Sequence, residues 1–240
     1  MKKIAILQSN YLPWKGVFDI INRVDAFVFL EDVQYTSRDW RNRNRVYTKD
    51  GLKWITVPVK KTNRNTLIKD SLIDNSTNWT NKHYGTIVRN YSKALCFDEY
   101  TWLVEEIYLN NRWKSLSEFN IYTTRLIAKE LGIETEFINS YELQVKGTKD
   151  DRLIDICKKL NATHYLSGPA AKSYIVPEKF ENNNIKLEYM EYKYPRYNQL
   201  HYPFEHGVTI LDLLFNCGSD ASYYIWGWRE NHRGESVDTL

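Results

Sequence analysis

The sequence predicts an α/β protein with a mainly parallel sheet flanked by helices, a β-hairpin arm and a helical insert. Short apolar runs alternate with segments of helical periodicity along most of the chain. Near the N-terminus, two such runs enclose an amphipathic segment, which predicts a βαβ unit with parallel strands and a right-handed crossover. An Asp-Gly pair between two strand-like segments predicts the hairpin.

The predicted strands are short apolar or alternating runs bounded by polar turns. In chain order they are Lys3–Leu7, Ala26–Leu30, Arg45–Tyr47, Trp54–Val59, Thr135–Ile138, Thr163–Leu166 and Lys186–Met190. The turn dipeptide Asp50-Gly51 separates the third strand from the fourth. These two strands therefore form the expected arm, and the others form the sheet.

The predicted helices carry apolar residues three and four positions apart. In chain order they are Gly16–Val24, Thr80–Ala94, Glu99–Asn110, Ser117–Leu131, Asp150–Leu160 and Thr209–Phe215. Ser117 precedes an acidic first turn, as a helix cap does. Thr209 and Asp212 have capping-box spacing, although the leucines around Asp212 are also compatible with a buried carboxylate in a site. We expect a single domain over residues 1–240, with a helical insert at about 75–132 and a polar tail after Trp228.

Composition favours a cytoplasmic protein without a structural metal. No apolar run approaches the ~18 residues that a membrane-spanning helix needs, and the N-terminus becomes polar too early for a signal peptide. The 3 cysteines, Cys96, Cys157 and Cys217, are odd in number and widely spaced, as is typical of thiols in a reducing compartment. The sequence has no C-x-x-C pair and no paired histidine ligands, so we expect no metal site.

A basic segment follows the second strand. From Thr36 to Asn65 there are nine Lys or Arg residues against two acids, a charge of +7 in a chain of net +3, which leaves −4 elsewhere. Arg41, Arg43 and Arg45 are two residues apart, so on an extended strand their guanidinium groups point to one face. With Arg38 they predict an anion site suited to phosphates. The alternative is a solvated strand face that improves solubility.

Polar residues follow several predicted strands, where ligands bind in open parallel sheets. Gln8 and Asn10 follow the first strand, Glu31 and Asp32 the second, and Ser167 a later one. We expect Gln8, Asn10 and Ser167 to bind substrate. Glu31 and Asp32 are the candidate catalytic residues because carboxylates accept protons, although salt bridges to the nearby arginines explain them equally well.

Aromatic residues in polar loops are a further candidate feature. The chain has 8 Trp and 18 Tyr, and Trp14 lies in such a loop. A ring with a polar edge suits binding of sugars or bases, so we predict a substrate contact for Trp14. Packing of the loop against the domain is an equally good explanation.

The chain resembles the WbqC-like protein family over nearly its whole length. The segments that carry the resemblance are Gln8-Ser-Asn10-Tyr11-Leu-Pro13-Trp14-Lys-Gly16-Val-Phe18-Asp19, Asp32-Val-Gln34-Tyr35, Trp40-Arg41-Asn42-Arg43-Asn44-Arg45, Thr56-Val-Pro58-Val, Tyr165-Leu-Ser167-Gly168 and Leu211-Asp212-Leu-Leu-Phe-Asn216-Cys-Gly218. The resemblance implies a cytoplasmic step in bacterial O-antigen or related polysaccharide biosynthesis that acts on an activated sugar. It implies no particular catalytic residues.

The first functional hypothesis is a transferase that forms an amide on a nucleotide-linked amino sugar, adding an acyl or aminoacyl group such as glycine. The donor is left open between ATP with an amino acid, an acyl-CoA and an aminoacyl-tRNA. One alternative is a glycosyltransferase that uses a sugar nucleotide, with Glu31 and Asp32 as ligands of a metal-diphosphate. Another is a non-catalytic module that binds a nucleic acid or a protein partner through the basic segment. The modest net charge of +3 makes nucleic acid the less favoured partner.

Overall fold

The computed structural model describes residues 1–231 and confirms the predicted fold class. Five parallel strands form one sheet in the order β5-β2-β1-β6-β7. They are β1 (Lys3–Leu7), β2 (Ala26–Phe29), β5 (Glu136–Asn139), β6 (His164–Ser167) and β7 (Lys186–Tyr189). Of the predicted polar tail, only the short helix α8 (Trp228–Asn231) is described, and residues 232–240 lie outside the described residues.

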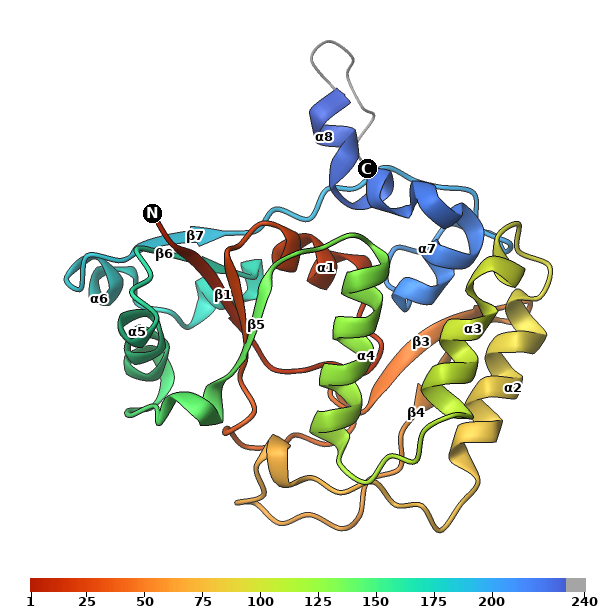
Figure 1. The fold of residues 1–240 in the computed structure, drawn as a ribbon, viewed down its shortest axis with the longest axis horizontal. Helices are drawn as coiled ribbons and strands as arrows, with labels where there is room; N and C mark the ends of the chain where they lie inside the picture. Colours follow the sequence, from red (N-terminus) through yellow and green to blue (C-terminus); the bar gives the residue numbers. More distant parts are fainter. Residues whose placement is uncertain (232–240) are drawn as a thin grey trace.

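Helices cover both faces of this sheet (Figure 1). The helices α1 (Lys15–Asn22) and α4 (Leu116–Glu130) pack on one face, where Phe27 and Phe29 of β2 contribute to the larger apolar core. The helices α5 (Lys149–Lys159) and α6 (Pro177–Glu181) pack on the other face against Ala26 and Val28. This alternation along β2 follows from the two-residue period of a strand, and it explains why the run is apolar throughout.

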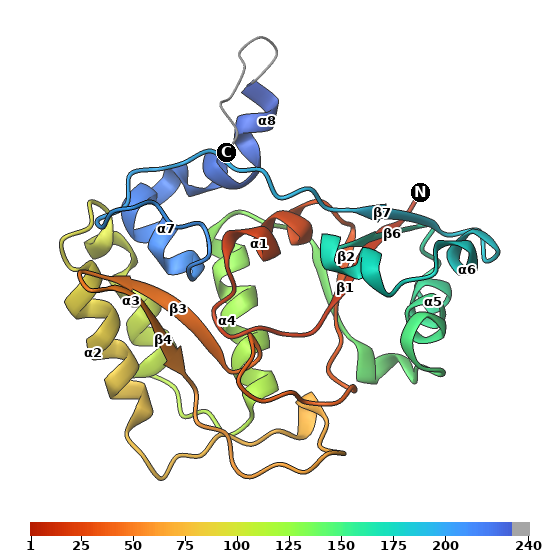
Figure 2. The ribbon, with the colours of Figure 1, turned by 180° about the vertical axis from the view of Figure 1, so that it is seen from behind.

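The hairpin arm lies at the end of the molecule away from α5 and α6, beside three further helices (Figure 2). It consists of β3 (Arg43–Thr48) and β4 (Gly51–Thr56), with Thr48 paired to Gly51 across the turn. The neighbouring helices are α2 (Trp79–Tyr91), α3 (Phe97–Tyr108) and α7 (Ile210–Cys217). Buried residues of this region belong to the same apolar core as α1 and α4, so the core is continuous from the sheet to the arm.

The residue that caps the N-terminus of α4 is not the predicted one. Ser115, not Ser117, is the N-cap, and its Oγ accepts a hydrogen bond from the Glu118 backbone N–H at 3.3 Å. Ser117 lies inside the first turn and is buried, and its hydroxyl donates to Glu31. Both serines match the sequence preference for a cap, but only Ser115 has the extended backbone that an N-cap requires.

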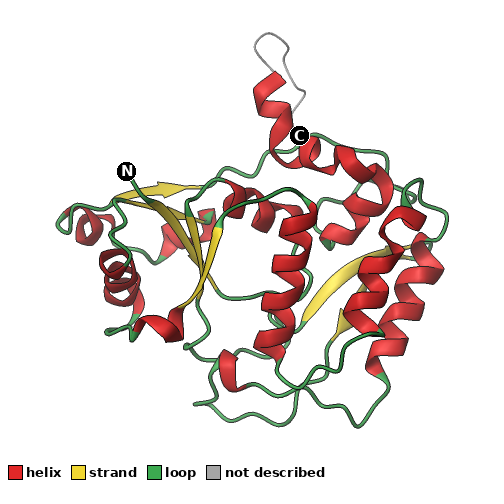
Figure 3. Ribbon diagram, in the orientation of Figure 1, coloured by secondary structure: helices red, strands yellow, loops and turns green. Residues whose placement is uncertain are grey.

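Residues 57–78 connect the arm to α2 mostly as loop (Figure 3). A short 3-10 helix, Ile68–Asp70, interrupts the segment. The backbone N–H groups of Ile68 and Lys69 donate to the carbonyls of Val33 and Glu31 at 3.0 and 2.9 Å. This segment therefore holds the loop that follows β2. No helix within residues 1–231 has the length and apolar character needed to cross a membrane.

Candidate functional site

A cavity of about 540 Å³ opens at the carboxyl ends of β1 and β6. After β1 the chain builds the sheet toward β2 and β5, and then crosses to the opposite side of β1 to add β6 and β7. The strand order thus reverses between β1 and β6, which is where open α/β sheets bind ligands. We call it the switch-point cavity. It is lined by Ile6, Leu7, Gln8, Asn10, Leu30, Val33, Arg41, Lys149, Asp150, Arg152, Leu153, Tyr165, Ser167, Gly168, Ala170, Ala171 and Tyr174.

The structure brings four of the sequence-predicted site residues together in this cavity. Gln8 and Asn10 enter it from the loop after β1, and Ser167 from the end of β6. Arg41 enters from the segment before β3. Glu31, Asp32, Trp14, Arg38, Arg43 and Arg45 are not among its lining residues.

Arg41 is held in place by neutral and acidic partners. Its Nη1 donates to Gln8 Oε1, and its Nε lies 3.3 Å from Asp39 Oδ1 in an ion pair. Burial lowers the pKa of the Arg41 guanidinium, whereas Asp39 and Glu31 raise it. Arginine stays protonated in proteins, so Arg41 supplies a fixed positive charge.

A second guanidinium comes from α5 and was not predicted. Arg152 Nη2 donates to Asp32 Oδ2, and Nη1 donates to the Gly147 carbonyl at 3.3 Å. Its Nε is buried and has no hydrogen-bond partner within residues 1–231. Arg152 lies in the first turn and a half of α5, whose backbone N–H groups favour anions. A basic residue at the start of the helix before β6 is the sequence signal that could have identified it.

Asp32 and Glu31 have different surroundings. Asp32 accepts from Ser140 Oγ and from Arg152, and so connects the loop after β2 to α5 and to the 3-10 helix after β5, Ser140–Leu143. Glu31 is fully buried and accepts from the Ser9 backbone N–H at 2.8 Å, from Ser9 Oγ at 3.0 Å and from Ser117 Oγ. Burial raises the pKa of the Glu31 carboxyl, and the hydrogen bonds from Ser117 and Ser9 act in the opposite direction. The geometry supports a positioning role for Glu31, and its catalytic role stays a prediction.

Replacing Glu31 with Gln is expected to lower the free energy of unfolding by about 1–3 kcal/mol, because an amide cannot accept all three hydrogen bonds. Urea denaturation measures this. Glu134→Gln, in an exposed loop, is the matched control and should change the free energy by less than about 0.5 kcal/mol. Equal stability of the two variants would contradict a positioning role.

The structure separates Arg41 from the other two arginines that the two-residue spacing places on one face. The strand β3 begins only at Arg43, so Arg41 lies in the preceding turn and points elsewhere. The Arg43 guanidinium lies 4.2 Å from the Trp54 ring centroid, and the Arg45 guanidinium lies 5.8 Å from that of Trp40. Arg38 is exposed and does not line the switch-point cavity. A face shared by all three arginines is therefore a wrong expectation, whereas Arg43 and Arg45 both lie against the Trp54 ring.

A smaller cavity of about 280 Å³ adjoins the arm, and Trp14 and Arg45 are part of it. We call it the hairpin cavity. It is lined by Asn10, Pro13, Trp14, Trp40, Asn44, Arg45 and Gly207. Asn10 lines both cavities, so the two are neighbours.

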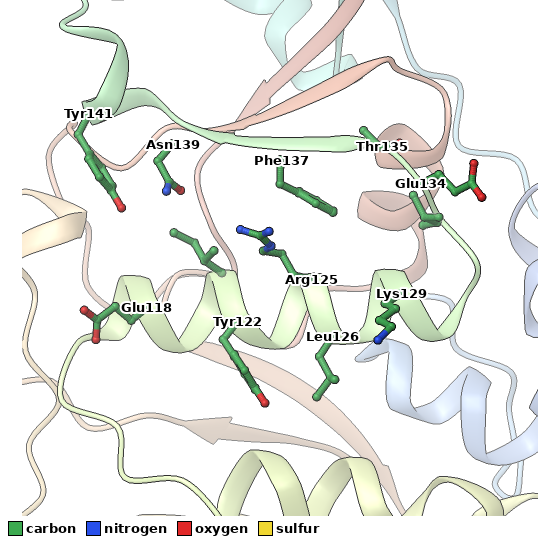
Figure 4. A pocket seen from close by; sticks show the side chains of 12 residues that line it. Glu118, Tyr122, Arg125, Leu126, Lys129, Glu134, Thr135, Phe137, Asn139 and Tyr141 are labelled. Carbon is green, nitrogen blue, oxygen red and sulfur yellow. The ribbon is translucent and has the colours of Figure 1, made fainter.

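A further cavity of about 570 Å³ lies between α4 and the edge strand β5 (Figure 4). Arg125 extends from α4 to Phe137 of β5, with its guanidinium carbon 5.6 Å from the ring centroid. Both acidic and basic side chains line this cavity, among them Glu118 and Lys129. Because this cavity runs along the side of the sheet, we place the candidate site in the switch-point cavity. Within residues 1–231 no group of three or more His, Cys, Asp or Glu side chains is arranged to hold a metal ion.

The fold and the cavity define an α/β protein whose candidate site, at the switch point of a parallel sheet, contains basic and polar side chains on a largely apolar lining. Comparison with known proteins gives the family. The WbqC-like protein family matches residues 8–224, and the chain belongs to this family. The "Uncharacterized protein Rv1507c" of Mycobacterium tuberculosis (strain ATCC 25618 / H37Rv) is 44% identical over 227 residues, which cover 94% of this chain and 98% of that protein. No solved structure matches the chain.

Proposed function

We propose that the protein is a transferase of bacterial surface-polysaccharide biosynthesis that forms an amide on a nucleotide-linked amino sugar. The observation that carries the proposal is the pair of guanidinium groups, Arg41 and Arg152, in the switch-point cavity. Lys149 adds a third positive charge there, against one lining carboxylate, Asp150. Arginine binds phosphate oxygens through paired hydrogen bonds, so this set suits the diphosphate of a sugar nucleotide.

The polar residues of the cavity fit the remaining parts of such a substrate. Gln8, Asn10 and Ser167 offer amide and hydroxyl groups to sugar hydroxyls or to an acyl oxygen. In amide formation the sugar amine attacks the carbonyl carbon of an activated acyl group and gives up a proton. The bond from that carbon to the activating group breaks, and AMP, CoA or tRNA leaves, depending on the donor class. Asp32 is the better placed of the two candidate bases, because its partner Arg152 lines the cavity. Glu31 lies behind the loop that carries Gln8 and Asn10.

For the acyl donor we propose three classes: ATP with an amino acid, an acyl-CoA or an aminoacyl-tRNA. Incubation of the protein with a nucleotide-linked amino sugar and each donor class, followed by mass spectrometry, tests for the amide. We expect a mass gain that corresponds to one acyl or aminoacyl group with one donor class. A sugar nucleotide that stays unmodified with all three contradicts amide transfer.

Replacing Arg152 with Gln is expected to weaken the binding of UDP or dTDP by about tenfold or more, since a charge-assisted contact contributes about 1.5–3 kcal/mol. Isothermal titration calorimetry measures the affinity. Arg89→Gln, an exposed position on α2, is the matched control and should bind as the wild type does. Wild-type affinity in the Arg152 variant would remove the main support for the site.

A further inference from the structure

On the side of the loop after β1, the hairpin cavity is lined by the ring of Trp14. The Trp14 ring packs edge-on against Tyr192 and Tyr194, with centroids 4.9 and 5.9 Å apart. A Cβ at Gly16 would lie 2.3 Å from Trp14 Cζ2, so the indole rests directly on this glycine. Asn44 Nδ2 donates to the Leu12 carbonyl at 2.7 Å and anchors the same loop to β3. The position of Trp14 is thus set before any ligand arrives.

The opposite wall is formed by the arm and by the segment before α7. The Arg45 guanidinium lies against Gly207, where an added Cβ would come within 2.1 Å of Nη2. The backbone N–H of Thr209 donates to the Arg45 carbonyl at 3.0 Å. The Trp40 side chain is 42% exposed and lies beside Arg45. Glycine at 207 therefore gives the guanidinium the space to line the cavity.

Two buried polar atoms of this lining have no hydrogen-bond partner within residues 1–231. They are Asn10 Oδ1, an acceptor, and Arg45 Nε, a donor. An unpaired buried polar atom is destabilising, and a ligand that pairs both would offset this. The matching ligand has a donor and an acceptor on one edge. The two indoles in the lining, Trp14 and Trp40, add a preference for a flat aromatic ring.

We infer that the hairpin cavity is the subsite for the base of a nucleotide. A heterocyclic base has flat faces for the two indoles and an edge that both donates and accepts hydrogen bonds. A volume of about 280 Å³ suits such a ring rather than a whole sugar nucleotide. The inference rests on the proposed function, which places a diphosphate at Arg41 and Arg152.

The shared residue Asn10 sets the orientation of the substrate. With the base in the hairpin cavity, the phosphates cross Asn10 toward Arg41, and the sugar lies deeper in the switch-point cavity near Ser167. The reacting amine is then on the side of Asp32, which Arg152 holds. Base recognition and chemistry are therefore separated along one substrate.

The test compares UDP with inorganic pyrophosphate, which lacks the base. Trp40→Ala is expected to weaken UDP binding about tenfold, in line with the stacking energy of a base, and to change pyrophosphate binding less than about twofold. Arg152→Gln should weaken both ligands. Trp40→Phe restores a ring and should recover most of the UDP affinity. Trp102→Ala on α3, exposed to the same 42%, is the matched control.

The outcomes separate this inference from the proposed function. If Trp40→Ala binds UDP as tightly as the wild type while Arg152→Gln does not, the base lies elsewhere and only the base subsite is overturned. Equal weakening of UDP and pyrophosphate in Trp40→Ala also overturns it, since the effect is then independent of the base. If the wild-type protein binds UDP no more tightly than pyrophosphate, the base contributes no affinity, and the base subsite is again overturned. Absence of binding to both ligands overturns the inference together with the proposed function.

Discussion

Replacing Asp212 with Ala is expected to lower the free energy of unfolding by about 3–5 kcal/mol, because two buried tyrosine hydroxyls lose their acceptor. Asp212 lies on α7 and is 1% exposed. Its carboxylate accepts from Tyr91 at 3.0 Å, from Tyr197 at 2.7 Å and from Gln199 Nε2 at 2.8 Å. These partners come from α2 and from the segment before α7, so the network joins elements distant in sequence.

Urea denaturation of Asp212→Ala, Asp212→Asn and Asp220→Ala tests this expectation. Asp212→Asn keeps an acceptor oxygen and the side-chain shape, so its loss should be smaller than that of the alanine variant. Asp220 is exposed and close in sequence, and its replacement should cost less than about 0.5 kcal/mol. An Asp212→Ala variant as stable as Asp220→Ala would contradict a structural role for the network.

Asp212 also illustrates what spacing can and cannot predict. The Thr209 and Asp212 spacing predicts a capping box, and Thr209 does cap α7 by accepting from the Leu211 backbone N–H at 3.5 Å. The Asp212 carboxylate instead bonds to Tyr91, 121 residues away. A local pattern identifies the cap because its partners are neighbours in the chain. Long-range partners depend on the packing of α2 against the arm and α7.

The fold class could be predicted from the hydrophobic periodicity of the sequence, whereas the site could be predicted only in part. Gln8, Asn10 and Ser167 meet because the carboxyl ends of parallel strands share an edge, and that rule can be applied to the sequence. Arg152 joins them from α5, and its place at the start of the helix before β6 is only a weak local signal for a site residue. The hairpin cavity was also missed, because it needs Gly207 beside Arg45.

The arginine spacing failed for a local reason. Asp39 accepts from the backbone N–H groups of Arg41, through its Oδ1 at 2.9 Å, and of Arg43, through its carbonyl at 3.2 Å. These bonds form a turn, so the extended backbone starts at Arg43 and the two-residue alternation does not include Arg41. An Asp ahead of the predicted strand was the available signal for that turn.

Lys15 is a buried lysine without a hydrogen-bond partner for its Nζ within residues 1–231. Its ammonium lies 4.9 Å from the Tyr194 ring centroid and 5.0 Å from that of Tyr197, so cation–π contacts replace part of its hydration. Burial lowers the pKa of Lys15 to about 7, and the Coulombic interactions with Cys217 and Asp212 act in the opposite direction. Below pH 7 the folded protein therefore contains a buried ammonium group, and this charge lowers the free energy of unfolding.

Replacing Lys15 with Met is expected to raise the free energy of unfolding at pH 6, by several kcal/mol at most, and by a smaller amount at pH 9. The folded-state pKa is about 7, and the unfolded-state value is ~10.4. Between these values only the unfolded chain holds the proton, so wild-type stability rises with pH from about 7 to 10. Below pH 7 both states are charged and the full cost of burial remains. From pH 7 to 9 the advantage of the variant should therefore shrink by about 2–3 kcal/mol.

Urea denaturation of both proteins at pH 6, 7, 8 and 9 measures this convergence. The groups that face Lys15 do not obscure it: burial lowers the pKa of His206 to about 4 and raises the pKa of Cys217 to about 12. Lys82→Met, at an exposed position on α2, is the matched control and should differ from the wild type by a constant amount across the range. A stability difference for Lys15→Met that is likewise independent of pH would show that Lys15 keeps an ordinary pKa. A destabilised variant at pH 6 would show that the aromatic rings stabilise the ammonium by more than burial costs.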